Sequence, residues 1–237
     1  MGANATTSVP AYAAGEVLTA ANLSITNSGI PVFATTTTRD AAFGGTGEKT
    51  LAEGQFAYIE ASNTTQYYDG AAWQSLTAGI TLVTAQAIGT GVSSVTVSNV
   101  FSASYENYLI TMEGCQWSAD DQGITFVLVG STASYYSNLL ITRYDTGAVT
   151  NINRNNAASS YVGVSDTNKA QNLNMNIFNP FTTDYTNWNG GANGYLWSGA
   201  VGGSHRVNTS YASFTIAAAG GATLTGGTIR VYGYTNS

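Results

Sequence analysis

Charged residues, cysteine and histidine are all scarce in this sequence of 237 residues. Lys and Arg supply 7 residues and Asp and Glu supply 13, so 8% of the chain is charged, against roughly a quarter in an average soluble domain. The formal net charge is −6, and a chain without a basic face is not expected to bind nucleic acid. The single cysteine, Cys115, permits no internal disulfide and no cysteine-based metal cluster. We therefore expect neither a cofactor nor a metal site.

Long apolar runs and targeting signals are missing as well. The sequence contains no run of about 18 apolar residues, so we expect no membrane insertion. The first ten residues, MGANATTSVP, have neither a basic start nor a hydrophobic centre, and a secretory signal is not expected there.

Glycine, tyrosine and small polar residues take the place of the missing charges. The chain has 27 Gly and 15 Tyr, and its Thr, Val and Tyr favour strands while Gly and Asn favour turns. A surface of Ser, Thr, Asn and Gly can be buried against another subunit without desolvating many charges. This composition is typical of a chain that assembles, although a stable extracellular monomer would have a similar one.

Residues 79–237 show one strand pattern after another. In 172–178, for example, apolar residues at 173, 175 and 177 alternate with asparagines, as in a strand with one buried face. We predict an all-β fold here, an antiparallel β-sandwich of jelly-roll-like type. The predicted strands are Ile80–Ile88, Val92–Val100, Tyr105–Glu113, Ile124–Val129, Asn138–Tyr144, Tyr161–Val164, Asn172–Phe178, Tyr195–Ala200, Tyr211–Ile216 and Thr228–Tyr234.

Two smaller segments precede the predicted sandwich. Residues 1–32 lack a hydrophobic core of their own and are predicted to form an extended N-terminal arm, with a short helix at Leu18–Leu23. Residues 33–78 are predicted to form a small β-meander module, which is too small to be stable alone. In this module we expect a helix at Arg39–Phe43, capped by Thr38, followed by three strands at 56–60, 65–69 and 71–75.

Two stretches of the chain resemble minor tail and fibre-like proteins of bacteriophages. The first combines V-F-A-x-x-x-x-R-D-A-A with a meander that ends in Y-D-G-x-x-W, and the second is G-T-I-R-V-Y-G-Y at Gly227–Tyr234. The resemblance implies a virion protein, commonly a homotrimer, whose partners are its own copies and other virion proteins. It implies an attachment role for the module residues Phe33, Arg39, Asp40, Tyr58, Tyr68, Asp69 and Trp73.

One glycine-rich stretch, GGTGEKT at Gly44–Thr50, superficially resembles a phosphate-binding loop. Such a loop needs glycine directly before its lysine, so that backbone N–H groups and the lysine converge on phosphate. Here Glu48 precedes Lys49 and would place a negative charge beside the phosphate. A plain surface loop is the better interpretation.

Histidine and cysteine offer little for nucleophilic catalysis. His205 could belong to a Ser–His–Asp triad, but the G-x-S-x-G turn that presents such a serine is absent. A histidine in a loop or at a strand edge is the expected alternative. Cys115 lies in an apolar, Trp-flanked stretch, where we expect a buried and inert thiol.

The carboxylates form no evident catalytic pair. A glycosidase needs two carboxyl groups about 5–10 Å apart, one of them with a raised pKa. Asp120 and Asp121 are adjacent, so a strand would direct them to opposite faces and a loop would leave both solvated. Three other aspartates lie in turn-like contexts: Asp145, Asp166 and Asp184. We expect no enzymatic activity and no catalytic residues.

Aromatic residues provide the candidate binding site. The stretch 182–197 reads as a loop whose Asn–Gly turns expose Tyr185, Trp188 and Tyr195, and a second cluster contains Tyr135 and Tyr136. Aromatic faces with amide and hydroxyl neighbours can recognise a sugar ring or a protein groove. The alternative is that these rings cap the sandwich or fill a subunit interface.

The function favoured at this stage is a tail fibre or minor tail protein of a phage virion. Its N-terminal part would dock on the particle, and its β-sandwich would bind a host cell-surface glycan or protein. The alternatives are a head fibre or capsid decoration protein and, third, a capsule-degrading glycosidase.

Overall fold

The chain divides into two compact units, residues 1–77 and 78–237. The computed structural model describes residues 6–17, 19–20, 29–76, 79–167 and 169–236. The helix predicted at Leu18–Leu23 falls largely outside the described residues. None of the helices in the described ranges has the length and apolar character needed to cross a bilayer.

The first unit contains a four-stranded sheet with the strand order β1-β2-β3-β4. Strands β2, β3 and β4 pair antiparallel and form the predicted meander, and β1 adds to β2 in parallel. Its elements are β1 (Val32–Phe33), α2 (Thr36–Asp40), β2 (Phe56–Ile59), the 3-10 turn η1 (Glu60–Ser62), β3 (Thr64–Tyr68) and β4 (Trp73–Ser75).

Helix α2 begins three residues before the predicted position. The predicted cap at Thr38 is wrong, because the N-cap is Thr35, whose side-chain oxygen accepts a hydrogen bond from the Thr38 backbone N–H at 3.2 Å. Threonine at this position satisfies one of the free N–H groups of the first turn. In a run of four threonines, the sequence alone does not distinguish which hydroxyl becomes the cap.

The described part of the N-terminal arm belongs to the core of the first unit. Val9 is buried together with Phe33, Ala42, Ala57 and Ile59. Its N–H donates to the carbonyl of Ala42 at 3.2 Å, and its carbonyl accepts from Lys49 N–H at 2.8 Å. Residues 6–12 are therefore held against the unit rather than projecting from it.

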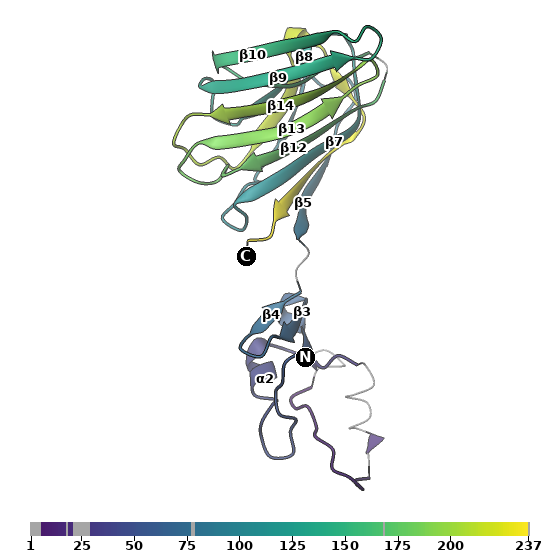
Figure 1. Cartoon of the computed structure of the whole chain (residues 1–237), viewed down its shortest axis with the longest axis vertical. Helices are drawn as coiled ribbons and strands as arrows, with labels where there is room; N and C mark the ends of the chain where they lie inside the picture. Colours follow the sequence, from purple (N-terminus) through teal and green to yellow (C-terminus); the bar gives the residue numbers. More distant parts are fainter. Residues whose placement is uncertain (1–5, 18, 21–28, 77–78, 168, 237) are drawn as a thin grey trace. The chain divides into compact units, whose positions relative to one another are not determined.

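The second unit is an antiparallel β-sandwich, as predicted. Its larger sheet has the order β10-β9-β14-β13-β12-β7-β17-β5, with β16 paired to β7, and its smaller sheet has the order β11-β8-β15-β6. The chain crosses repeatedly between the two sheets, as in a jelly-roll-like topology, and Figure 1 shows the strands from β10 to β7 side by side in one layer. The elements are β5 (Ile80–Ala87), β6 (Ser94–Val97), β7 (Asn107–Trp117), β8 (Gly123–Leu128), β9 (Tyr135–Arg143), β10 (Val149–Ala157), β11 (Ser160–Val164), β12 (Gln171–Phe178), β13 (Thr186–Asn193), β14 (Trp197–His205), β15 (Phe214–Ala218), the 3-10 turn η2 (Ala219–Gly221), β16 (Leu224–Thr225) and β17 (Thr228–Tyr234).

Each of the ten predicted strand regions overlaps a strand of the structure; the two-residue β16 was not predicted, and neither were the longer strands β10 and β13. Both have few apolar residues: β10 reads VTNINRNNA and β13 reads TNWNGGAN. Strand β13 forms because it is paired along its whole length with β12 on one side and β14 on the other. The prediction of a loop across 182–197 is therefore wrong for its central eight residues.

A chain of aromatic rings fills the space between the two sheets. Phe126 of the smaller sheet lies 5.6 Å from Trp188 and 5.7 Å from Phe214, measured between ring centroids. The contacts continue from Trp188 to Tyr135 at 6.2 Å and from Tyr135 to His205 at 4.6 Å. All five rings are buried, and four of them, Phe126, Trp188, Phe214 and Tyr135, belong to the hydrophobic core between the sheets. These aromatic contacts contribute a large buried apolar area to both sheets.

Glycine in β13 is required by the close approach of β12. A Cβ at Gly190 would lie 2.7 Å from the Cα of Met175 and closer still to the Asn174 carbonyl oxygen, whereas a Cβ at Gly202 in β14 meets nothing within 4 Å. We expect Gly190→Ala to destabilise the second unit by about 3 kcal/mol through overpacking, and Gly202→Ala to change its stability by less than about 0.5 kcal/mol.

Urea denaturation of the full chain, followed by tryptophan fluorescence, measures this difference. Three of the four tryptophans, Trp117, Trp188 and Trp197, lie in the second unit. Equal unfolding midpoints for the two variants would contradict the close pairing of β13 with β12.

Candidate functional site

Several of the predicted attachment residues meet around one buried guanidinium in the first unit. Arg39 on α2 is 6% exposed, and its Cζ lies 4.6 Å from the ring centroid of Trp73 on β4. Its Nε and Nη2 atoms donate to Asp40 Oδ1 at 2.9 and 2.6 Å, and its Nη1 donates to Gln66 on β3. The Tyr68 ring contacts the other side of the cluster, 5.6 Å from Trp73. This arrangement links the helix to β3 and β4 of the meander.

The other attachment residues have structural roles in the same unit. Asp69 closes the turn between β3 and β4: its Oδ1 accepts the N–H groups of Ala71 and Ala72 at 2.8 and 2.7 Å. The Ala72 N–H is the main cause that lowers the pKa of Asp69. The Tyr58 hydroxyl donates to Asn63 Oδ1 at 2.9 Å, and Asn63 is the left-handed residue that ends η1.

Phe33 completes the module as a fully buried core residue, with its ring 6.2 Å from that of Phe43. The sequence pattern behind the resemblance thus corresponds to a core, a stacked cation and a turn.

Two of the five predicted receptor-binding residues are buried in the sandwich core. Trp188 is 2% exposed and Tyr135 is fully buried, so the expectation that they are displayed at loop tips is wrong. The Tyr135 hydroxyl accepts the Leu128 N–H at 2.8 Å, and burial raises its pKa to about 12. Alternation along β13 and β9 turns these rings inward, towards the smaller sheet.

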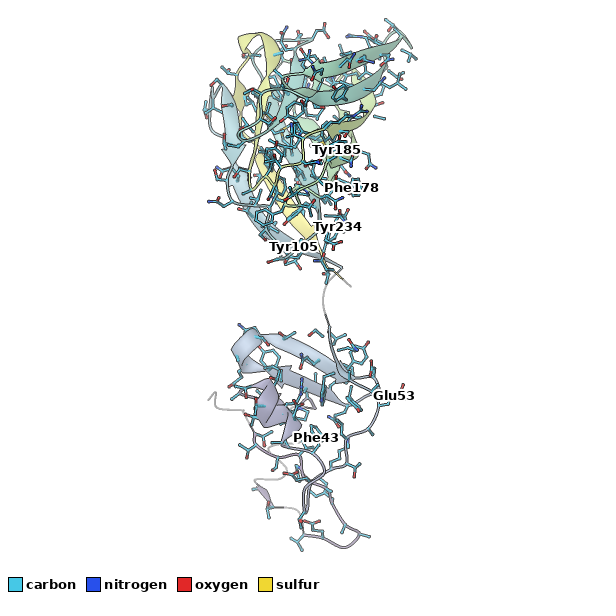
Figure 2. The ribbon with its side chains drawn as sticks, turned by 90° about the vertical axis from the view of Figure 1, so that its left-hand side faces the viewer. Phe43, Glu53, Tyr105, Phe178, Tyr185 and Tyr234 are labelled. Carbon is cyan, nitrogen blue, oxygen red and sulfur yellow. The ribbon has the colours of Figure 1, made fainter. Side chains whose placement is uncertain are left out.

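The other three candidate residues lie on the surface but do not form one cluster. Tyr185 and Tyr195 are 44% and 62% exposed and flank opposite ends of β13, a strand about 25 Å long. Figure 2 labels Tyr185 beside Phe178 on one side of the sandwich. Tyr136 lies on the outward face of β9, where the Arg206 guanidinium stacks 4.3 Å from its ring centroid.

Tyr195 borders a pocket of about 390 Å³ at one end of the sandwich. Four chain segments meet there: the turn after β7, the end of β9, the connection from β11 to β12 and the connection from β13 to β14. The side chains that line this end pocket are Asp120, Asp121, Arg143, Asp166, Thr167, Lys169, Tyr195 and Leu196.

Hydrogen bonds hold the carboxylates of the end pocket in place. Asp120 accepts the backbone N–H of Thr167 at 2.5 Å, and this bond lowers the pKa of Asp120. Arg143 lies 3.4 Å from Asp121 Oδ1 and 3.2 Å from Asp145 Oδ1. Asp166 is 5% exposed, and its Oδ2 accepts the N–H groups of Tyr195 and Leu196 at 2.9 and 3.4 Å. Asp166 thereby fixes the segment that carries the exposed tyrosine.

Buried polar groups without hydrogen-bond partners lie next to the residues that line the end pocket. Gln171 is 1% exposed, and neither its Nε2 nor its Oε1 has a hydrogen-bond partner among the described residues; the same is true of Trp197 Nε1. A Cβ at Gly194 would lie 2.7 Å from Trp197 Nε1 and 3.0 Å from Gln171 Nε2, and closer to Asp166 Oδ2. These groups converge on one point next to the end pocket.

Sequence reasoning did not identify the end pocket. The sequence predicts a turn at Asp166, and it predicts that Asp120 and Asp121 either face opposite sides of a strand or are solvated in a loop. All three lie in connections between strands, which the fold brings together. Arg143 precedes Asp166 by 23 positions and follows Asp121 by 22. A local spacing rule cannot detect such a group. Its residues come together only where the end of β9 meets the connections that follow β7, β11 and β13.

The histidine and cysteine of the chain both lie in the sandwich core. His205 is fully buried, with Nε2 2.6 Å from Ser131 Oγ and 3.1 Å from the Ala133 carbonyl oxygen. The expectation of a loop or strand-edge histidine is therefore wrong. Its Nδ1 has no partner among the described residues, so no carboxylate orients the ring as in a triad. Cys115 is buried as predicted, and burial raises its pKa to about 11.

The glycine-rich stretch at Gly44–Thr50 forms a surface loop, as expected. The Glu48 carboxylate accepts the Gly45 N–H at 2.9 Å and so occupies the donor that a phosphate would need. Within the described ranges, no three His, Cys, Asp or Glu side chains are grouped in a way that could hold a metal ion.

No family model and no curated protein sequence matches this chain.

Arg39→Ala is expected to destabilise the first unit by about 2 kcal/mol, because it removes a buried stacked cation and its hydrogen bonds to Asp40 and Gln66. Lys49→Ala is a matched control, since the Lys49 side chain donates to Gln55 at an exposed site of the same unit and the backbone bonds of Lys49 are kept. Urea denaturation followed by far-UV circular dichroism should show an earlier first-unit transition for Arg39→Ala alone. A shift in the transition of the second unit would contradict the assignment.

The stability of the second unit should fall as the pH decreases from 7 to 5. Burial lowers the pKa of His205 in the folded state, so the unfolded chain binds a proton first as the pH passes below the ordinary value of about 6.5. His205 is the only histidine of the chain, and His205→Gln should remove this dependence. Thermal melts across this pH range test it, and an equal pH dependence in the variant would contradict it.

Proposed function

We propose that the chain is a structural component of a bacteriophage virion, a tail fibre or minor tail protein. The first unit docks on the particle, and the second unit presents its β-sandwich to the host surface. The observation that carries the proposal is that the chain divides into two compact units. The residues of the phage-like meander pattern build the small first unit, and the end pocket lies in the second.

The first unit supports a docking role through its size and construction. A meander of this size is marginal by itself, and here a segment of the N-terminal arm, through Val9, adds to its small core. Such a unit gains stability when it is buried against a neighbouring protein. The resemblance to phage proteins lies in this unit and in β17.

The outer face of the larger sheet supports an assembled state, which we propose is a homotrimer. Along the fully described strands β12, β13, β14, β9 and β10, the outward strand positions carry no charged side chain; the Arg206 guanidinium, which lies over this part of the face, stacks on Tyr136, and the ion pair of Glu113 and Arg230 lies on the adjoining strands β7 and β17. Burying this face against another copy therefore costs little charge desolvation. The outward asparagines are Asn138, Asn151, Asn153, Asn155, Asn172, Asn174, Asn176, Asn187, Asn189 and Asn193.

The electrostatics of the end pocket favour binding over hydrolysis. Glycosidases protonate the leaving group with a carboxylic acid of raised pKa. The Thr167 N–H instead lowers the pKa of Asp120, which favours the ionised form. This supports a non-enzymatic role for Asp120.

Competition for host cells tests the proposed function. Cells preincubated with micromolar amounts of the full chain should adsorb the phage that encodes it several-fold more slowly, because the protein occupies the receptors. Heat-unfolded protein is the control. Unchanged adsorption together with binding of the chain to purified capsids would contradict the host-binding role and support the head-decoration alternative.

A further inference from the structure

We propose that the end pocket of the sandwich binds a neutral saccharide unit of a host-surface polysaccharide, with Tyr195 as its stacking platform. The inference rests on the proposed function, because it assigns the host contact to a site and a ligand class. The volume of about 390 Å³ lies within the range of small-molecule sites.

The distribution of charge marks this end of the sandwich as special. The second unit has seven acidic and five basic residues, and half of these twelve gather at the end pocket. Five of them line it, and Asp145 pairs with Arg143 there. Because charged residues are scarce in the rest of the chain, we infer that these six residues are gathered here for a function and not only to keep the surface hydrated.

The mixture of signs selects the class of ligand. The lining carries three aspartates, one arginine and one lysine, so an anionic ligand would meet the carboxylates and a cationic ligand would meet Arg143 and Lys169. A neutral polyol avoids both conflicts. Each sugar hydroxyl donates one hydrogen bond and accepts others, and neighbouring hydroxyls fit a site where acceptors and donors alternate.

The tyrosine supplies the apolar part of such a site. Tyr195 is 62% exposed, and Lys169 Nζ lies over its ring, 5.3 Å from the centroid. An exposed aromatic face next to polar groups can stack on the C–H face of a sugar ring while the polar groups bind its hydroxyls. The backbone N–H of Tyr195 is held by the nearly buried Asp166, so the segment is ordered before a ligand arrives, which reduces the entropy cost of binding.

Polar atoms without hydrogen-bond partners also lie next to the pocket. Buried side-chain amides and indole N–H groups are rarely left without partners, because each costs free energy. Gln171 and Trp197 are both left so, next to Asp166 and Gly194. They account for three of the nine such atoms among the described residues, and they add to the polar character of this end of the sandwich.

An array of defined bacterial oligosaccharides, probed with the full chain, tests the inference. It should contain neutral hexose and N-acetylhexosamine oligomers, uronic-acid oligomers and phosphorylated oligomers. We expect binding to neutral members, with affinity reduced about tenfold or more by Tyr195→Ala and by Asp121→Asn. Tyr185→Ala is the matched control: an exposed tyrosine at the other end of β13, whose loss should leave binding unchanged.

Adsorption to host cells separates this inference from the proposed function. If the unmodified chain and Tyr195→Ala bind cells equally well, the end pocket is not the receptor site, although the host-binding role stands. Selective binding of uronic-acid or phosphorylated members would overturn the choice of a neutral ligand. Loss of array binding in Tyr185→Ala but not in Tyr195→Ala would place the site at the opposite end and overturn the proposal.

Discussion

The contact between the rings of Phe126 and Trp188, 5.6 Å apart, connects the two sheets of the sandwich, and the rest of the second unit depends on it. Trp188 projects from β13, at the centre of the larger sheet, and Phe126 from β8 of the smaller sheet. Aromatic pairs of this kind combine a large buried area with a preferred geometry. Because this contact fixes how the sheets face each other, it also fixes where the connections at their ends meet.

Scarcity of charge makes the few charged groups informative. In the first unit, Arg39 is buried at 6% exposure and is stabilised by stacking and by hydrogen bonds, so it acts as a packing element. In the second unit, half of the charged residues gather at the end pocket. The same composition that permits broad neutral faces to be buried in an assembly therefore leaves one polar, chemically varied site.

The sequence predicted the fold better than the site, for a physical reason. Strands with alternating apolar residues, such as Gln171–Phe178, carry their burial pattern locally. Strand β13 does not, because its glycines and asparagines are kept extended by pairing with β12 and β14. The sequence therefore predicts that the Trp188 ring is exposed in a loop, and this prediction is wrong because the ring lies in the core. The end pocket escaped prediction because segments far apart in the chain build it.

Electron microscopy of intact virions, with a gold-labelled antibody against residues 79–237, tests the central claim most directly. The account predicts label at the tail, where a sandwich that binds the host surface must be displayed. Label spread over the head would contradict the tail assignment and support a decorating protein. Absence of label from every particle would contradict the claim that the chain is a virion component.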